Sequence, residues 1–188
     1  MIIALDIQHL NKPPSASNPK SSKDRGVAYG TLTEVDISTV YANLARQLLD
    51  KAGHTVYMGF TGEYSERQSL AVRMKTDVYI ACHVNAGKGS YSLIEIKKKS
   101  SGKDLPYAQI LLDALLSKLG TKKASTPIWE LQEGDRGFSC ISNTQMVSLL
   151  LEPFFIDNDE YYKKVLTGEL QEQIAQAILE AVTKWSQK

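Results

Sequence analysis

The chain has 188 residues, which is long enough to bury a substantial core within one domain. Its net charge of +1 argues against nucleic-acid binding, because phosphate contacts require a surplus of Lys and Arg on one face. No apolar run reaches the ~20 residues that cross a membrane, so we expect no membrane insertion. The two cysteines, Cys82 and Cys140, form neither a disulfide framework nor a CxxC metal motif.

The first third of the chain contains a buried strand and a long amphipathic helix. Residues Ile2–Ile7 form a continuous apolar run, as expected for a central strand that is covered on both faces. The polar loop 11–30, with three prolines, is long enough to be functional or mobile. A helix is predicted from Glu34 to about Ala52, because apolar residues recur with a 3.6 period and Thr33 can cap it.

The rest of the chain continues to alternate between strands and helices. A helix is predicted to be capped by Asp104, and a last helical region begins near Asp157. The remaining predictions are strands at 54–60, 77–85, 90–98 (more exposed) and 146–151, a short helix at 65–75, and strand fragments at 128–129 and 138–141.

This alternation predicts an α/β three-layer sandwich, with a central, mostly parallel, twisted sheet of about five or six strands flanked by helices. No internal repeat and no second domain boundary is visible, so residues 1–188 are expected to form a single domain.

Polar side chains follow several of the predicted strands. His9, His83 and Glu152 each come at a strand end, and Glu34 comes where a helix begins. In open α/β sheets ligands bind outside the carboxyl ends of the strands, so these groups are expected to meet there. Two imidazoles and one carboxylate form a hydrolytic zinc site, and a further carboxylate can serve as general base. A single histidine at a strand end is more often structural, but two of the three histidines are placed this way.

The motifs around these residues resemble those of the zinc-dependent N-acetylmuramoyl-L-alanine amidases, the type 3 amidases of bacterial cell-wall turnover and phage endolysins. The similarity spans most of the chain and rests on a histidine motif, a glutamate that opens a helix, a second histidine motif with Asn-Ala, and a strand that ends in glutamate. In chain order, these four motifs are Asp6–His9, Leu32–Ile37, Cys82–Ala86 and Leu150–Asn158. Two further segments are also similar to the family: a helix end with the strand that follows it, Leu48–Tyr57, and a leucine-to-arginine segment, Leu70–Arg73.

The resemblance implies one zinc ion held by His9, Glu34 and His83, with Glu152 as the catalytic carboxylate. It also implies hydrolysis of the amide bond between N-acetylmuramic acid and L-alanine in peptidoglycan, with zinc acidifying a water molecule. Asn85 and Glu95 are candidate substrate-binding residues, although Asn85 could equally close a turn and Glu95 could simply be solvated.

Some residues depart from the family pattern. Gln8 and Leu10 stand where the family has glycines, and Pro153 follows Glu152. These differences leave the exact substrate open. The alternatives are a zinc hydrolase of the same fold that acts on another peptide or amide polymer, and a non-catalytic wall-binding or regulatory domain. Asp6 is a candidate hydrogen-bond partner for a ligand histidine, or a cap for the following loop.

The remaining expectations concern partners and location. Peptidoglycan is the expected partner, and the protein is expected to act as a monomer without a separate cell-wall-binding domain. The first residues read as a strand and not as a signal peptide, so synthesis in the cytoplasm is expected unless the chain has been trimmed. Such an enzyme would reach the wall after phage-mediated or other lysis.

Overall fold

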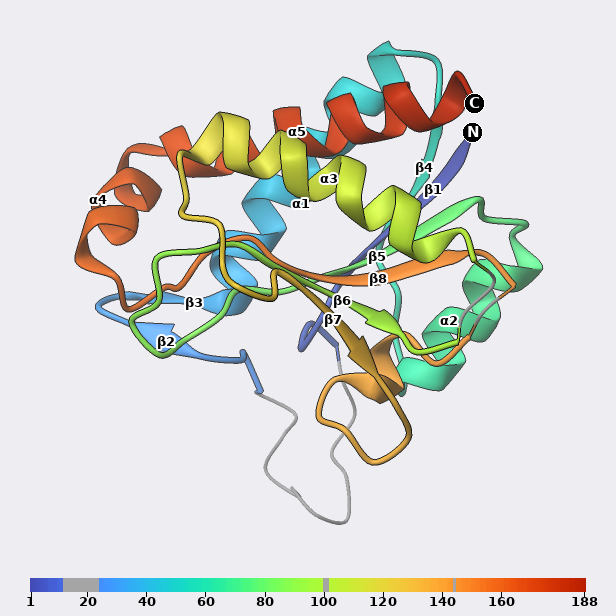
Figure 1. Cartoon of the computed structure of the whole chain (residues 1–188), viewed down its shortest axis with the longest axis horizontal. Helices are drawn as coiled ribbons and strands as arrows, with labels where there is room; N and C mark the ends of the chain where they lie inside the picture. The colour runs from blue at the N-terminus through green and yellow to red at the C-terminus, as the bar shows by residue number, and fades with distance from the viewer. Residues whose placement is uncertain (12–23, 100–101, 144) are drawn as a thin grey trace.

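A computed structural model describes residues 1–11, 24–99, 102–143 and 145–188, so most of the predicted 11–30 loop lies outside the described residues. At its centre is a sheet with the strand order β4-β1-β5-β8-β6-β7 (Figure 1). The strands of this sheet are β1 (Ile2–Ile7), β4 (Thr55–Tyr57), β5 (Val78–Cys82), β6 (Leu93–Lys97), β7 (Ile128–Leu131) and β8 (Val147–Glu152).

The sheet is mostly parallel, as predicted. β1 pairs in parallel with β4 and β5, β5 pairs in parallel with β8, and β6 pairs in parallel with β7. Only the pair of β6 and β8 is antiparallel among the described strands of this sheet. β1, β5 and β8 therefore end at the same edge, and the beginning of β6 lies beside the end of β8.

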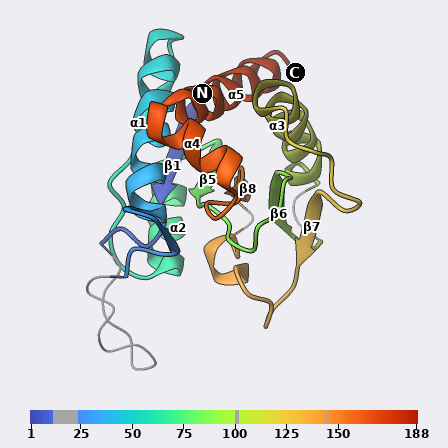
Figure 2. The same ribbon diagram turned by 90° about the vertical axis from the view of Figure 1, so that its left-hand side faces the viewer.

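Helices cover the two faces of the sheet unequally. α1 (Glu34–Lys51), α3 (Asp104–Leu119) and α5 (Glu169–Ser186) pack together over one face, where the larger hydrophobic cluster lies (Figure 2). The shorter α2 (Tyr64–Arg73) and the 3₁₀ helix η2 (Phe138–Cys140) accompany a smaller cluster on the other face. α4 (Asp159–Thr167) precedes α5 in the chain. The sheet is thus flanked by helices on both faces.

Local chemistry fixes the start of α1. Thr33 is the N-cap, and its hydroxyl accepts a hydrogen bond from the Asp36 N–H at 3.3 Å, while Asp36 accepts one from the Thr33 N–H at 2.9 Å. This reciprocal capping box satisfies amide groups that have no partner within the helix. Glu34 is therefore held in the first turn, as the sequence predicts.

A short hairpin leads into α1. β2 (Ala28–Tyr29) pairs antiparallel with β3 (Leu32–Thr33). The Glu34 N–H donates to the Val27 carbonyl at 2.8 Å, so the hairpin folds back over the beginning of the helix. No helix in the described part of the chain has the length and apolar character needed to span a bilayer.

Three local predictions were wrong. The strand expected to be more exposed is β6, which is largely buried because it lies between β8 and β7 beneath α3. The strand fragment expected at 138–141 is instead η2. Lys103, and not Asp104, occupies the N-cap of α3, since the Asp104 carboxylate accepts a hydrogen bond from the Ser148 N–H at 2.9 Å.

Candidate metal and catalytic site

The carboxyl edge of the sheet brings the predicted site residues together. Ile7 is paired with Cys82, and Cys82 is paired with Leu151, so the residues that follow these positions emerge side by side. His83 and Glu152 are such residues, and His9 follows β1 by two positions. Glu34 joins them from the first turn of α1.

His9, Glu34 and His83 form a compact cluster. His83 Nδ1 lies 2.7 Å from Glu34 Oε1, and His9 Nε2 lies 3.6 Å from Glu34 Oε2. The two imidazole rings are 5.4 Å apart between centroids and perpendicular. Each residue offers one ligand atom, and these atoms all lie within 4.8 Å of one another. Small side-chain movements would bring all three to the ~2.0–2.2 Å distances of a zinc ion.

The surroundings of the cluster fit a bound cation. Glu34 is only 3% exposed, and a carboxylate is rarely buried without a positive partner. Oε1 of Glu34 also accepts a hydrogen bond from the Val84 N–H at 3.0 Å, and Oε2 accepts one from the Val27 N–H at 3.1 Å. The carboxylate is therefore oriented by backbone N–H groups just after β5 and just before the β2–β3 hairpin.

The same contacts shift two pKa values. Burial alone would raise the pKa of Glu34, but hydrogen bonding to His83 and the charges of both histidines lower it overall. Burial alone would lower the pKa of His83, but contacts with Cys140 and Glu34 raise it well above its usual range. These contacts therefore favour the protonated form of the His83 imidazole.

If the cluster binds zinc, as the sequence motifs imply, its affinity is expected to depend on pH because a ligand histidine must be neutral. Since the pKa of His83 is raised, zinc must displace its proton, and the apparent affinity should rise about tenfold per pH unit below that pKa. Zinc titration calorimetry in two buffers of different ionisation enthalpy measures the proton release. Zinc binding that releases no proton would contradict this expectation.

A glycine packs directly against Glu34. Gly26 has φ +71°, and a Cβ there would lie 2.1 Å from Glu34 Oε2. We expect Gly26→Ala to displace the carboxylate and weaken zinc binding by about tenfold or more, measured by competition with a chromophoric chelator. Gly53→Ala is the matched control, because Gly53 has φ +84° with nothing within 4 Å of a Cβ. The left-handed φ costs alanine about 1–2 kcal/mol at either position, so the control reproduces this cost without the contact with Glu34. Equal zinc affinities in the two variants would contradict the prediction.

Glu152 lies at the end of β8 beside the cluster. Its Oε2 is buried and makes no hydrogen bond with any described residue. Burial raises the pKa of Glu152 to about 8, and the charge of His83 opposes that shift. A buried carboxylate with a free oxygen and a raised pKa has the properties of a general base or acid.

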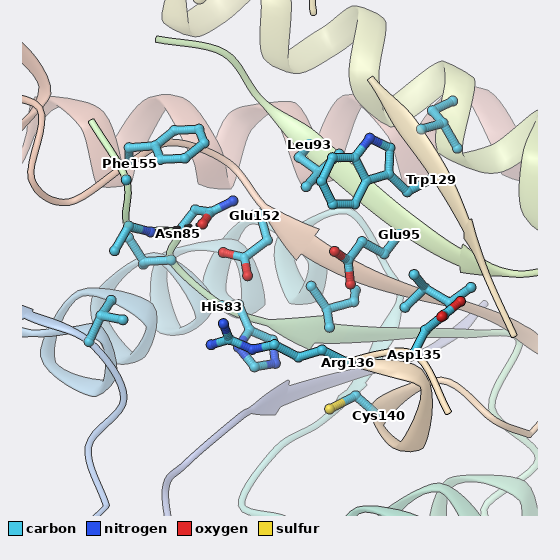
Figure 3. Close-up of a pocket in the computed structure, with 18 of the residues that line it drawn as sticks. His83, Asn85, Leu93, Glu95, Trp129, Asp135, Arg136, Cys140, Glu152 and Phe155 are labelled. Carbon is cyan, nitrogen blue, oxygen red and sulfur yellow. Dashed lines mark hydrogen bonds between the residues drawn. The ribbon is translucent and has the colours of Figure 1, made fainter. Parts of the chain in front are cut away.

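The cluster and Glu152 open into a cavity of about 1240 Å³. Figure 3 shows Glu152 and Glu95 pointing into it from neighbouring strands, with Arg136 reaching across beneath them and Trp129 on the far wall. Arg136 is the only Lys or Arg among the described residues that line the cavity. Burial raises the pKa of both glutamates, and the charge of Arg136 opposes that rise. The cavity lining thus combines the charged groups of Glu95, Glu152 and Arg136 with the aromatic ring of Trp129.

The two candidate substrate-binding residues both line this cavity. The Asn85 Oδ1 also accepts a hydrogen bond from the neighbouring Ala86 N–H at 2.8 Å, and Asn85 forms an isolated parallel bridge with Phe155. Glu95 is half-buried beside Gly137, and burial raises its pKa, so it is not a freely solvated surface carboxylate.

Asp6 has neither of its expected roles. It is fully buried, and its partners are Arg67, Tyr79 and Gln8, with no bond to a ligand histidine. The carboxylate beside His9 is Asp24, whose Oδ2 lies 3.0 Å from His9 Nδ1. Sequence reasoning missed Asp24, Arg67 and Arg136, because they come from a loop, a helix and a turn with no pattern to mark them.

Similarity to solved structures supports the α/β fold. The amidase AmiC2 of Nostoc punctiforme shares 19% identity over 100% of this chain and 98% of that chain, with a TM-score of 0.77. The amidase from Clostridium difficile 630 shares 21% identity over 100% and 97%, with a TM-score of 0.78. Ami1 from Mycobacterium abscessus shares 16% identity over 98% of each chain, with a TM-score of 0.80. No curated protein sequence matches the chain.

The fold with its histidine–glutamate cluster at the carboxyl edge is typical of metal-dependent α/β hydrolases. The family model Amidase_3, N-acetylmuramoyl-L-alanine amidase, matches residues 3–184. The chain belongs to this family, and its activity is cleavage of the amide bond between N-acetylmuramic acid and L-alanine in peptidoglycan. The resemblance seen in the sequence motifs is confirmed.

Proposed function

We propose that this amidase binds one zinc ion through His9, Glu34 and His83, and that Glu152 is its catalytic base. The observation that carries the proposal is the cluster itself, in which three potential ligand atoms lie within 4.8 Å of one another. One comes from α1, and the other two come from residues just after β1 and β5. Residues so distant in sequence meet because the parallel strands end together.

The zinc ion, when bound, supplies Lewis-acid polarisation of the amide carbonyl and acidifies a water molecule. Glu152 is the residue that takes the proton of the attacking water and delivers it to the departing L-alanine amine. Its free Oε2 is available for both transfers, and its burial keeps it basic enough to hold the proton between them.

Asn85 and Glu95 complete the proposal as substrate-binding residues. Both line the cavity, and Glu95 reaches it from the strand next to that of Glu152. We further propose that residues 1–188 act as one catalytic domain and as a monomer, which light scattering of the purified protein would test. Cytoplasmic synthesis followed by release to the wall stays a prediction.

The test is digestion of purified peptidoglycan with and without a chelator, followed by identification of the new ends. We expect free L-alanine amino groups without new reducing sugars, loss of this release in the chelator, and recovery when zinc is restored. Full activity after the metal has been removed would overturn the zinc proposal. New reducing ends would show that the sugar chain is being cut instead.

A further inference from the structure

We propose that Arg67 is the residue that positions His9 for metal binding, although it lies outside the metal cluster. The inference rests on the proposed zinc site. Arg67 belongs to α2 and is fully buried, and its side chain lies beneath the turn that carries His9. It acts through the backbone, so it is a positioning residue and not a catalytic one.

The guanidinium of Arg67 binds the chain on both sides of His9. Nη1 donates to the Ile7 carbonyl at 3.3 Å, and Nη2 donates to the Leu10 carbonyl at 2.7 Å. These two carbonyls bracket the dipeptide that contains His9. The Nε of Arg67 donates to the Gly62 carbonyl at 2.8 Å, which ties the same group to the segment before α2.

The turn needs such support because His9 has an unusual backbone conformation. Its φ is +62°, in the left-handed region that residues other than glycine seldom adopt. A residue stays there only when its surroundings hold it. The Arg67 hydrogen bonds restrain the backbone on either side of His9, and Asp24 contacts the imidazole of His9.

Asp6 fixes the orientation of the guanidinium. Its Oδ1 accepts from Arg67 Nη1 at 3.0 Å, and its Oδ2 accepts from Tyr79 and Gln8, so the buried ion pair is held on several sides. Lysine could not replace Arg67 here. Its ammonium offers three donors at a single point, whereas the planar guanidinium reaches separate acceptors at Asp6, Gly62 and Leu10 together.

The test is the zinc dissociation constant, measured by competition with a chromophoric chelator. We expect Arg67→Lys to weaken zinc binding about 10- to 100-fold, as for other residues that orient a ligand. In a His9→Ala background the same substitution should change the residual affinity less than about twofold, because the ligand through which it acts is gone. An equal loss in both backgrounds would reduce Arg67 to general support of the fold and overturn the inference.

Two further variants separate an effect on zinc affinity from a general loss of stability. Ala71→Gly weakens the same helix without touching the His9 turn, and zinc affinity should survive in it at matched thermal stability. Should Arg67→Lys fail to fold, Asp6→Asn keeps the shape and loses the ion pair, and unchanged zinc affinity there would overturn the inference. If His9→Ala itself leaves zinc affinity unchanged, the proposed zinc site is wrong and this inference falls with it. If His9→Ala weakens zinc binding but Arg67→Lys and Asp6→Asn leave the zinc dissociation constant unchanged, the proposed zinc site is retained and Arg67 has no positioning role.

Discussion

Replacing Glu152 by glutamine is expected to lower the rate of L-alanine release from peptidoglycan about 10²- to 10⁴-fold, the range that a positioned general base contributes. Glutamine has nearly the same shape, but it cannot take a proton from water. Zinc affinity should be unchanged, because Glu152 is not in the three-residue cluster. The rate is measured by labelling new amino groups on a defined muropeptide, with zinc content determined on the same sample.

The control for this variant is Glu133→Gln, an exposed carboxylate on the loop after β7 that does not line the cavity. It should retain normal activity. Near-normal turnover of Glu152→Gln would mean that another group removes the proton, and Glu95 on the neighbouring strand would then be the next residue to test.

Replacing His83 by alanine is expected to abolish both zinc binding and activity. His83 is 8% exposed and contacts Glu34 directly. Its loss therefore removes one proposed ligand and takes a hydrogen-bond partner away from Glu34, which is a second proposed ligand. We expect zinc affinity to fall more than about 100-fold, which exceeds the effect of losing a residue that only orients a ligand. Metal analysis after gel filtration measures the loss.

His54→Ala is the matched control for this variant. His54 lies beyond the end of α1, where its Nδ1 is 3.3 Å from the Met1 amino group, and it is outside the cluster. It should keep its zinc and its activity. A His83→Ala protein that retained stoichiometric zinc would contradict the ligand assignment.

The sequence was most informative where local rules decide the structure. The apolar run of β1, the Thr33 cap of α1 and the polar residues at strand ends were sufficient to predict the fold class and to bring His9, Glu34, His83 and Glu152 to one edge. Capping and the ends of parallel strands depend on few neighbours, so they can be read from a single sequence.

Long-range packing limited the rest. The burial of β6 depends on its insertion between β8 and β7, which lie more than thirty positions away in the chain. Asp6 is paired with Arg67, and His9 is paired with Asp24. Nothing in the sequence spacing marks Arg67 or Asp24 as these partners. Arg136 reaches the cavity from an irregular turn, whose course depends on the strands on either side.

The unequal covering of the sheet has a consequence for how the protein tolerates change. The three long helices cover one face (Figure 2), whereas the cavity is lined by residues of the other face, among them Leu131, Cys140 and Leu150. Substitutions of core residues beneath these helices should mainly change the melting temperature. Substitutions of residues that line the cavity should mainly change turnover. Thermostability could therefore be engineered on the first side, away from the turn of α1 that carries Glu34, and specificity could be redesigned on the second at lining residues that are outside its smaller core cluster.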